Sequence, residues 1–80
     1  MTPEERYRAA IDGWIDVLIE GALQLETYGQ AIDNLKTEQG KKINALGRSE
    51  MDTVMQFTIN HIYSTAINHI YKLMKEQEIK

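Results

Sequence analysis

Apolar residues recur through the first half of the chain at the spacing of a long helix. They fill two positions of a seven-residue repeat, with Ile11, Leu18, Leu25 and Ile32 at one position and Trp14, Gly21, Tyr28 and Leu35 at the other. Two apolar positions in each seven residues are typical of a helix that packs lengthwise against another helix. Thr2, Pro3 and Glu5 provide a start, because they supply an N-cap hydroxyl, a first-turn proline and a carboxylate three residues after the cap. The pattern predicts a helix over about 3–38, and Gly29 leaves open a kink or break near its own position.

A second helix is predicted in the second half of the chain. Its apolar residues are spaced by three or four positions and are Met55, Ile59, Ile62, Ala66, Ile70 and Leu73. Ser49 is a suitable N-cap, followed by acidic residues in the first turn, so we expect this helix over about 49–77. Gly40 and Gly47 are natural helix terminators and indicate a linker over about 39–48. The sequence therefore predicts a single all-α domain over 1–80, built as a long antiparallel helical hairpin.

The segment 14–25 carries apolar side chains on almost every side of the predicted helix. One partner helix covers only one stripe, so a second hairpin is expected to bury the remainder. A chain of 80 residues without cysteine has a small core and no disulfide to support it, which also favours self-association. We therefore expect a homodimer that resembles a four-helix bundle. Its predicted interface consists of Trp14, Leu18, Ile19, Leu25, Ile59, Ile62, Ala66 and Ile70.

The charge of the chain is modest and unevenly distributed. The net charge is −3, which argues against a general nucleic-acid binder. Residues 1–39 hold eight acidic and three basic side chains, whereas residues 40–80 hold four and six, a division that suits segments lying side by side. The polar N-terminus is unlike a signal peptide, and segment 14–25 is too short and too charged to span a bilayer. We expect a soluble, cytoplasmic protein with neither nucleic acid nor membrane as a partner.

The two histidines lie in an exact repeat, Ile-Asn-His-Ile-Tyr, at 59–63 and 67–71. An offset of eight residues rotates a helical position by about 80°, so His61 and His69 do not share a face. Zinc chelation along one helix requires histidines four residues apart, and the chain has no cysteine. The sequence thus predicts no metal and no cofactor. An enzyme that uses His61 or His69 as a general base is the least favoured hypothesis, since no nucleophile and base are paired.

A group of basic and aromatic side chains supports an alternative based on ligand binding. Arg48, Lys41 and Lys42, together with Tyr7, are suited to a nucleotide-like anion held between subunits. Residues 45–51, with the sequence ALGRSEM, resemble the second helix of the small hairpin proteins that phages use to sequester cyclic oligonucleotide signals. This resemblance covers seven residues and implies an oligomeric sequestering protein, which we keep as the alternative function.

The favoured functional prediction is a non-enzymatic protein-interaction module. No catalytic pair, metal-ligand set or glycine-rich phosphate loop stands out in the sequence. The long apolar helices instead indicate a helical oligomer, at least a dimer, that contacts another protein. A small bacterial or phage regulator or inhibitor is the class of protein that we expect.

Overall fold

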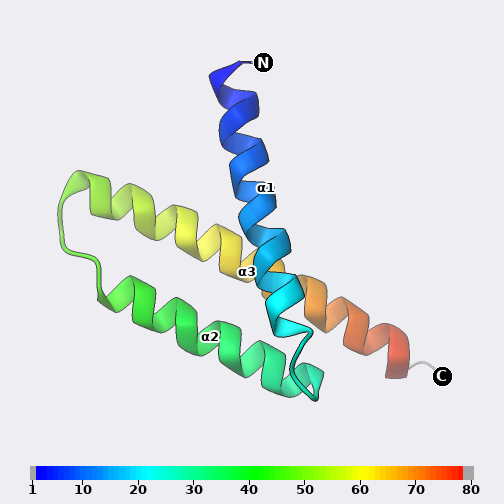
Figure 1. Ribbon diagram of the computed structural model, residues 1–80. Coiled ribbons are helices and arrows are strands. Elements are labelled where there is room, and N and C mark those ends of the chain that lie inside the picture. Colours follow the sequence, from blue (N-terminus) through cyan, green and yellow to red (C-terminus); the bar gives the residue numbers. More distant parts are fainter. Residues whose placement is uncertain (1, 79–80) are drawn as a thin grey trace.

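The chain folds into three helices in the computed structural model, which describes residues 2–78. They are α1 (Pro3–Ala22), α2 (Tyr28–Asn44) and α3 (Glu50–Glu78). Figure 1 shows α2 and α3 as an antiparallel hairpin, with α1 crossing α3 and its amino-terminal half standing away from the hairpin. The residues between and beside these helices contain no strand within 2–78. The predicted all-α class is therefore confirmed, but the prediction of two helices is wrong.

The predicted helix over 3–38 breaks after Ala22, and α2 begins at Tyr28. At the break, the Leu23 N–H donates to the Ile19 carbonyl at 2.9 Å, and the Thr27 hydroxyl accepts the Gln30 N–H at 3.0 Å. Threonine is a favoured N-cap because its hydroxyl satisfies a backbone donor that has no partner within the helix. The break precedes Gly29, which lies inside α2. The reversal lets both parts of the apolar pattern pack on α3.

The second connection is shorter than the predicted linker. Gly40 does not end a helix, because α2 continues to Asn44 and the connection covers only residues 45–49. A Cβ atom added at Gly40 would meet no neighbour, so this glycine lies on an open face of α2. Ser49 is the N-cap of α3, as predicted. Its hydroxyl accepts the Asp52 N–H at 3.1 Å and donates to the Asp52 carboxylate at 2.8 Å.

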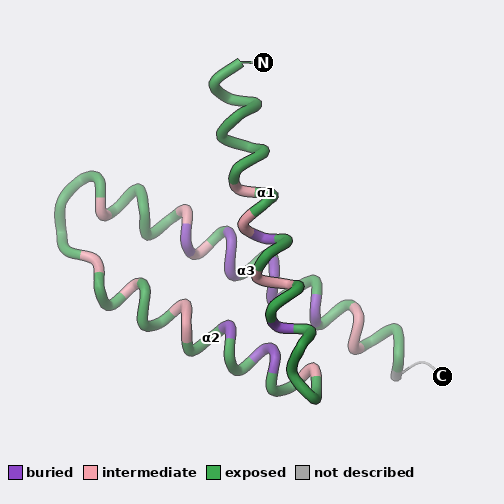
Figure 2. Tube along the Cα trace, in the orientation of Figure 1, coloured by how far each residue is buried: buried purple, intermediate pink, exposed green. Residues whose placement is uncertain are grey.

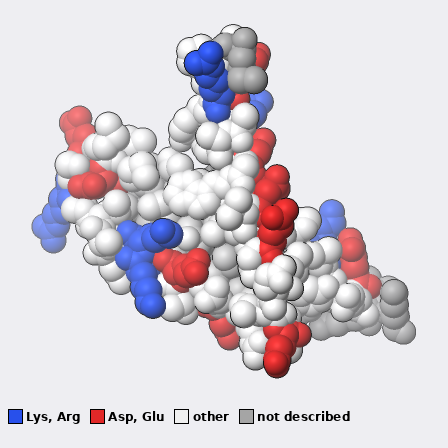
Figure 3. All heavy atoms as spheres, viewed as in Figure 1, with Lys and Arg blue, Asp and Glu red and all other residues white. Residues whose placement is uncertain are grey.

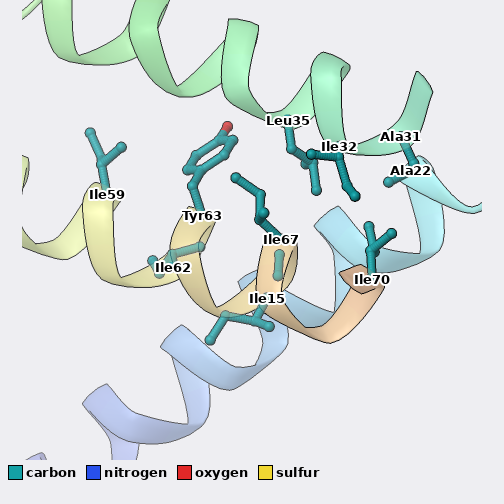
Figure 4. Close-up of a cluster of buried hydrophobic side chains, with 11 residues drawn as sticks. Ile15, Ala22, Ala31, Ile32, Leu35, Ile59, Ile62, Tyr63, Ile67 and Ile70 are labelled. Carbon is teal, nitrogen blue, oxygen red and sulfur yellow. The ribbon is translucent and has the colours of Figure 1, made fainter. Parts of the chain in front are cut away.

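The core lies along the middle of α3, between α1 and α2 (Figure 4). Its members are Ile15, Ala22, Ala31, Ile32, Leu35, Ile59, Ile62, Tyr63, Ala66, Ile67 and Ile70. Figure 2 shows that burial is concentrated where the helices meet, whereas the first half of α1 and the outer end of the hairpin are exposed. α3 is central because it offers apolar side chains to both neighbouring helices.

Most of the predicted dimer interface packs inside one chain. Four of its members, Ile59, Ile62, Ala66 and Ile70, are buried in the core. Trp14, Leu18 and Ile19 are half-buried against that core, and Leu25 is exposed in the connection between α1 and α2. The extra helix explains this arrangement, because α1 and α2 cover two faces of α3, whereas the two-helix prediction placed a single helix against it.

The molecule is less compact than a typical folded domain of the same length. Its Cα radius of gyration is 14.2 Å, whereas a compact domain of this length has a radius of about 12 Å. Its accessible surface is 6114 Å², compared with about 4,900 Å² for a folded monomer of this mass. The surplus surface arises because the first half of α1 diverges from α3 instead of packing along it (Figure 1).

Candidate functional site

An apolar hollow lies between the diverging halves of α1 and α3. It has a volume of about 360 Å³, and we call it the α1–α3 groove. It is lined by Tyr7, Ala10, Ile11, Trp14, Met51, Val54, Met55 and Thr58. The groove exists because α1 is held to α3 by its later turns, where Ile15 points toward the core (Figure 4). Toward their amino-terminal ends the two helices separate and leave their apolar faces uncovered.

Large apolar side chains in this region are open to solvent. Met51 is 70% exposed, Tyr7 58% and Val54 55%, and the neighbouring Phe57 on α3 is 71% exposed. Single exposed apolar residues are common, whereas a contiguous group marks an interaction surface or a ligand groove. Aromatic residues and methionine are also enriched where proteins contact one another. The groove and Phe57 therefore form the strongest candidate for a functional surface.

One wall of the groove is positioned by a hydrogen bond. The Tyr7 hydroxyl lies 3.2 Å from the Thr58 hydroxyl, which itself lies 3.1 Å from the Val54 carbonyl. Because the single hydroxyl hydrogen of Thr58 goes to that carbonyl, Tyr7 donates and Thr58 accepts. The contact uses the polar atoms of both side chains and leaves the Tyr7 ring as an apolar wall.

A second hollow, which shares Tyr7 and Ile11 with the groove, lies between the first turns of α1 and His61 of α3. It has a volume of about 720 Å³ and is lined by Pro3, Glu4, Tyr7, Arg8, Ile11, Asp12 and His61. The exposed acidic residues Asp12, Asp16 and Glu20 lie four residues apart along one edge of α1, and Figure 3 shows acidic side chains in red along this helix. Within residues 2–78, no three histidine or acidic side chains gather closely enough to hold a metal ion.

The structure divides the predicted ligand-binding residues between two places. Lys41 and Lys42 lie in the last turn of α2, and Arg48 lies in the following connection, so the three cations gather at the outer end of the hairpin. Tyr7 instead contacts Thr58, which is about 12 Å along α3 from the start of that helix. The four residues do not form one site within a single chain.

The Ile-Asn-His-Ile-Tyr repeat mainly packs α3 against α2. Asn60 accepts a hydrogen bond from the Gln39 side chain at 2.9 Å. Tyr71, in the second copy of the repeat, lies beneath Lys36, whose Nζ is 3.4 Å from its hydroxyl and 5.8 Å from its ring centre. Both histidines are exposed. The repeat thus supplies core and boundary residues, and the structure assigns no shared site to the two histidines.

Tyr63 is the one core residue with a polar side-chain atom. Its hydroxyl is buried and has no hydrogen-bond partner among the described residues. Burial raises the pKa of Tyr63, and the negative charge of Glu38 on α2 raises this pKa further. The ring points toward α2, away from the α1–α3 groove (Figure 4). Its position on the α2 side indicates a structural role for Tyr63.

Sequence reasoning missed Met51, Val54 and Phe57 as site residues. Their signal was present, because these apolar residues recur every three positions on α3, outside the stripe that the prediction used. Only the divergence of α1 showed that this second face remains uncovered.

Comparison of the chain with family models, curated proteins and solved structures gives no match in any of the three. None of the helices within residues 2–78 is long and apolar enough to cross a membrane.

Proposed function

We propose that the chain is a non-enzymatic protein-interaction module and that the α1–α3 groove is its contact surface. The observation that carries this proposal is the gathering of exposed apolar side chains from two helices into one hollow. An amphipathic helix is a suitable occupant, because such a helix places its apolar face in a groove of this kind.

The chemistry of the groove favours a polypeptide over a small metabolite. Sites for small molecules combine apolar walls with a few polar groups that converge on the ligand and fix its orientation. In the groove, the hydroxyls of Tyr7 and Thr58 are already engaged with each other and with the Val54 carbonyl. The remaining lining residues offer apolar contact, which suits the broad and adaptable surface of another protein.

The module is proposed to act as a helical oligomer, at least a dimer. The surplus of about 1,200 Å² over the surface of a folded monomer of this mass is enough for one side of a standard interface, which is about 800 Å². A module of this kind regulates or inhibits a target by covering part of its surface. A bacterial or phage regulator or inhibitor is accordingly the class that we propose.

Site-specific photo-crosslinking in the native host tests the proposal. A photoreactive amino acid at Met51 is expected to give discrete covalent adducts to another protein, distinguished by mass from adducts between two copies of the chain, whereas the same group at Glu20, on the acidic edge of α1, is expected to give none. Both positions are exposed, so the comparison separates the groove from exposure alone.

A binding measurement between the purified chain and the purified captured protein then completes the test. A captured protein should bind the purified chain, lose that binding on Met51→Glu and retain it on Glu20→Ala. Absence of adducts to another protein at Met51, or equal adducts at both positions, contradicts the proposal.

A second candidate function is the sequestration of a nucleotide-like anion. The supporting observation is that Lys41, Lys42 and Arg48 gather at the outer end of the hairpin. Cations in this arrangement are suited to phosphate groups, although Tyr7 would have to come from another subunit. A ligand that binds the native state raises the melting temperature, so cyclic di- and trinucleotides are expected to do so for the chain but not for a Lys41→Ala/Arg48→Ala variant. An unchanged melting temperature at saturating nucleotide contradicts this candidate.

A further inference from the structure

Four residues form an exposed line along the first three turns of α3, beside the α1–α3 groove. They are Glu50, Val54, Phe57 and His61, and all four are exposed. Their spacing of four, three and four residues places them within about 60° of one another around the helix. The line, which we call the α3 stripe, points roughly opposite to Ile59 and Tyr63, which pack toward α2. Its two apolar side chains are largely open to solvent, since Val54 is 55% and Phe57 71% exposed, and His61 lies beside the hollow that the first turns of α1 line.

The α3 stripe is complementary to itself. The midpoint between Val54 and Phe57 along the helix is also the midpoint between Glu50 and His61. A second α3 that runs antiparallel about this midpoint therefore places Val54 opposite the partner's Phe57. The same alignment places Glu50 opposite the partner's His61. Each apolar residue meets an apolar residue, and each carboxylate meets an imidazole N–H that donates a hydrogen bond to it.

We propose that a second copy of this chain occupies the α3 stripe, with the two α3 helices antiparallel across a two-fold axis. Such a contact is isologous, because the same patch of both subunits meets across the axis. The proposal rests on the proposed function and names the partner of one part of its surface. Val54 belongs to both the stripe and the groove, so the dimer contact continues into the groove of each subunit.

The contact extends beyond the four residues of the stripe. A stable interface removes about 800 Å² from each partner, so the contact combines the stripe with the adjoining edge of the α1–α3 groove, which Val54 also lines. The stripe also has the composition of a small interface, since an apolar centre of Val54 and Phe57 is flanked by polar residues at both ends.

Sedimentation equilibrium of the purified full-length chain, over a wide range of micromolar concentrations, tests the proposal. The chain is expected to form a dimer. Phe57→Glu places two carboxylates near the axis and is expected to weaken dimerisation by at least about a hundredfold. Val17→Glu is the matched control, since Val17 is 65% exposed on α1 and lies outside the stripe. Circular dichroism establishes that both variants remain helical.

A charge exchange tests the alignment itself. His61→Glu places Glu50 opposite a second carboxylate in two symmetric pairs, and dimerisation is expected to weaken by about tenfold. Glu50→His in the same chain restores an opposite pair with the two roles exchanged, and dimerisation is expected to recover. Failure of the double variant to recover overturns the antiparallel alignment.

The outcomes separate this inference from the proposed function. A chain that is monomeric throughout, or a Val17→Glu variant that dissociates while Phe57→Glu does not, overturns the α3–α3 contact. If the photoreactive group at Met51 still captures another protein, the proposed interaction module stands without the α3–α3 contact. A dimer that dissociates on Phe57→Glu, found together with no adducts to another protein at Met51, supports the contact and contradicts the module.

Discussion

The hydroxyl of Tyr7 lies 3.2 Å from that of Thr58, although 51 positions separate the two residues in the sequence. Tyr7 belongs to the half of α1 that diverges from α3, and Thr58 lies on α3 at the edge of the groove. This contact joins the diverging half of α1 to α3 in a region where most neighbouring side chains are exposed. One neutral hydrogen bond therefore helps to hold the two walls of the α1–α3 groove at their observed separation.

Replacement of Tyr7 by phenylalanine should loosen the amino-terminal half of α1 without unfolding the protein. An exposed neutral hydrogen bond contributes about 0.5–1.5 kcal/mol, so the global free energy of unfolding should fall by no more than this. Amide hydrogen exchange in residues 3–12 should accelerate severalfold, whereas the amides of 59–70 should be unaffected. Tyr71→Phe, which alters a tyrosine on the other part of α3, is the control. Unchanged exchange in residues 3–12 would show that Tyr7 does not hold α1.

The pattern of apolar residues predicted α3 better than it predicted the first half of the chain. Ser49 is a recognisable N-cap, and the apolar stripe that follows it is not interrupted by glycine. The seven-residue repeat before it also continues without a gap, although the helix breaks after Ala22. Periodicity shows which side chains share a face of a helix but does not show whether the chain reverses between two turns. Thr27 is the local signal for a new helix start, since its hydroxyl caps α2.

Thr27→Ala should lower the free energy of unfolding by about 1 kcal/mol, because the Gln30 N–H loses its partner at the start of α2. Thr2→Ala removes the equivalent cap from α1 and is the matched comparison, since the Thr2 hydroxyl accepts the Glu5 N–H at 3.2 Å. Its effect should be smaller, because the start of α1 is exposed and distant from the core. Urea denaturation of both variants measures the difference. Greater stability of Thr27→Ala would show that the cap does not maintain the break.

The candidate site could be predicted only in part, because its formation depends on the angle between helices. The sequence predicted Tyr7 as a ligand contact and Trp14 as a dimer contact, but it did not place the two in one groove. Tyr7 and Trp14 line the α1 side of the groove, and Met51 and Val54 line its α3 side. The gap between the two sides depends on how far α1 diverges from α3. That angle depends on packing at the crossing, and no local pattern in the sequence encodes it. The basic group at the end of the hairpin was predictable because its members are close in sequence.

Ile62 is fully buried where α1 meets α3, so Ile62→Ala should be strongly destabilising. Truncation of a buried isoleucine costs about 2–5 kcal/mol, and a domain of this length has a total stability of roughly 4–12 kcal/mol. The variant should melt far below the wild type or be partly unfolded at room temperature. Val17→Ala removes apolar atoms at a largely exposed position and should change the melting temperature little. Similar melting of the two variants would contradict the assignment of Ile62 to the core.

Tyr63 offers a test that involves both stability and pH. Its buried hydroxyl has no partner among the described residues, and an unpaired buried polar group costs about 1–3 kcal/mol. Tyr63→Phe keeps the ring and removes this group, so the variant should be at least as stable as the wild type at neutral pH. Loss of more than about 1 kcal/mol would instead show that the hydroxyl forms a hydrogen bond in solution.

The pH dependence of stability should also change in Tyr63→Phe. Burial raises the pKa of Tyr63 above its ordinary value of 10.0, and the charge of Glu38 adds to this effect, so the unfolded chain releases the phenol proton before the folded chain does. As the pH rises above 10, the unfolded state therefore gains stability, and the free energy of unfolding falls by up to about 1.4 kcal/mol per pH unit from this group. The loss continues until the pH reaches the raised pKa of the folded state.

Urea denaturation between neutral pH and the alkaline range should show this decline in the wild type and a smaller decline in Tyr63→Phe. Identical declines in the wild type and Tyr63→Phe would contradict a raised pKa for Tyr63.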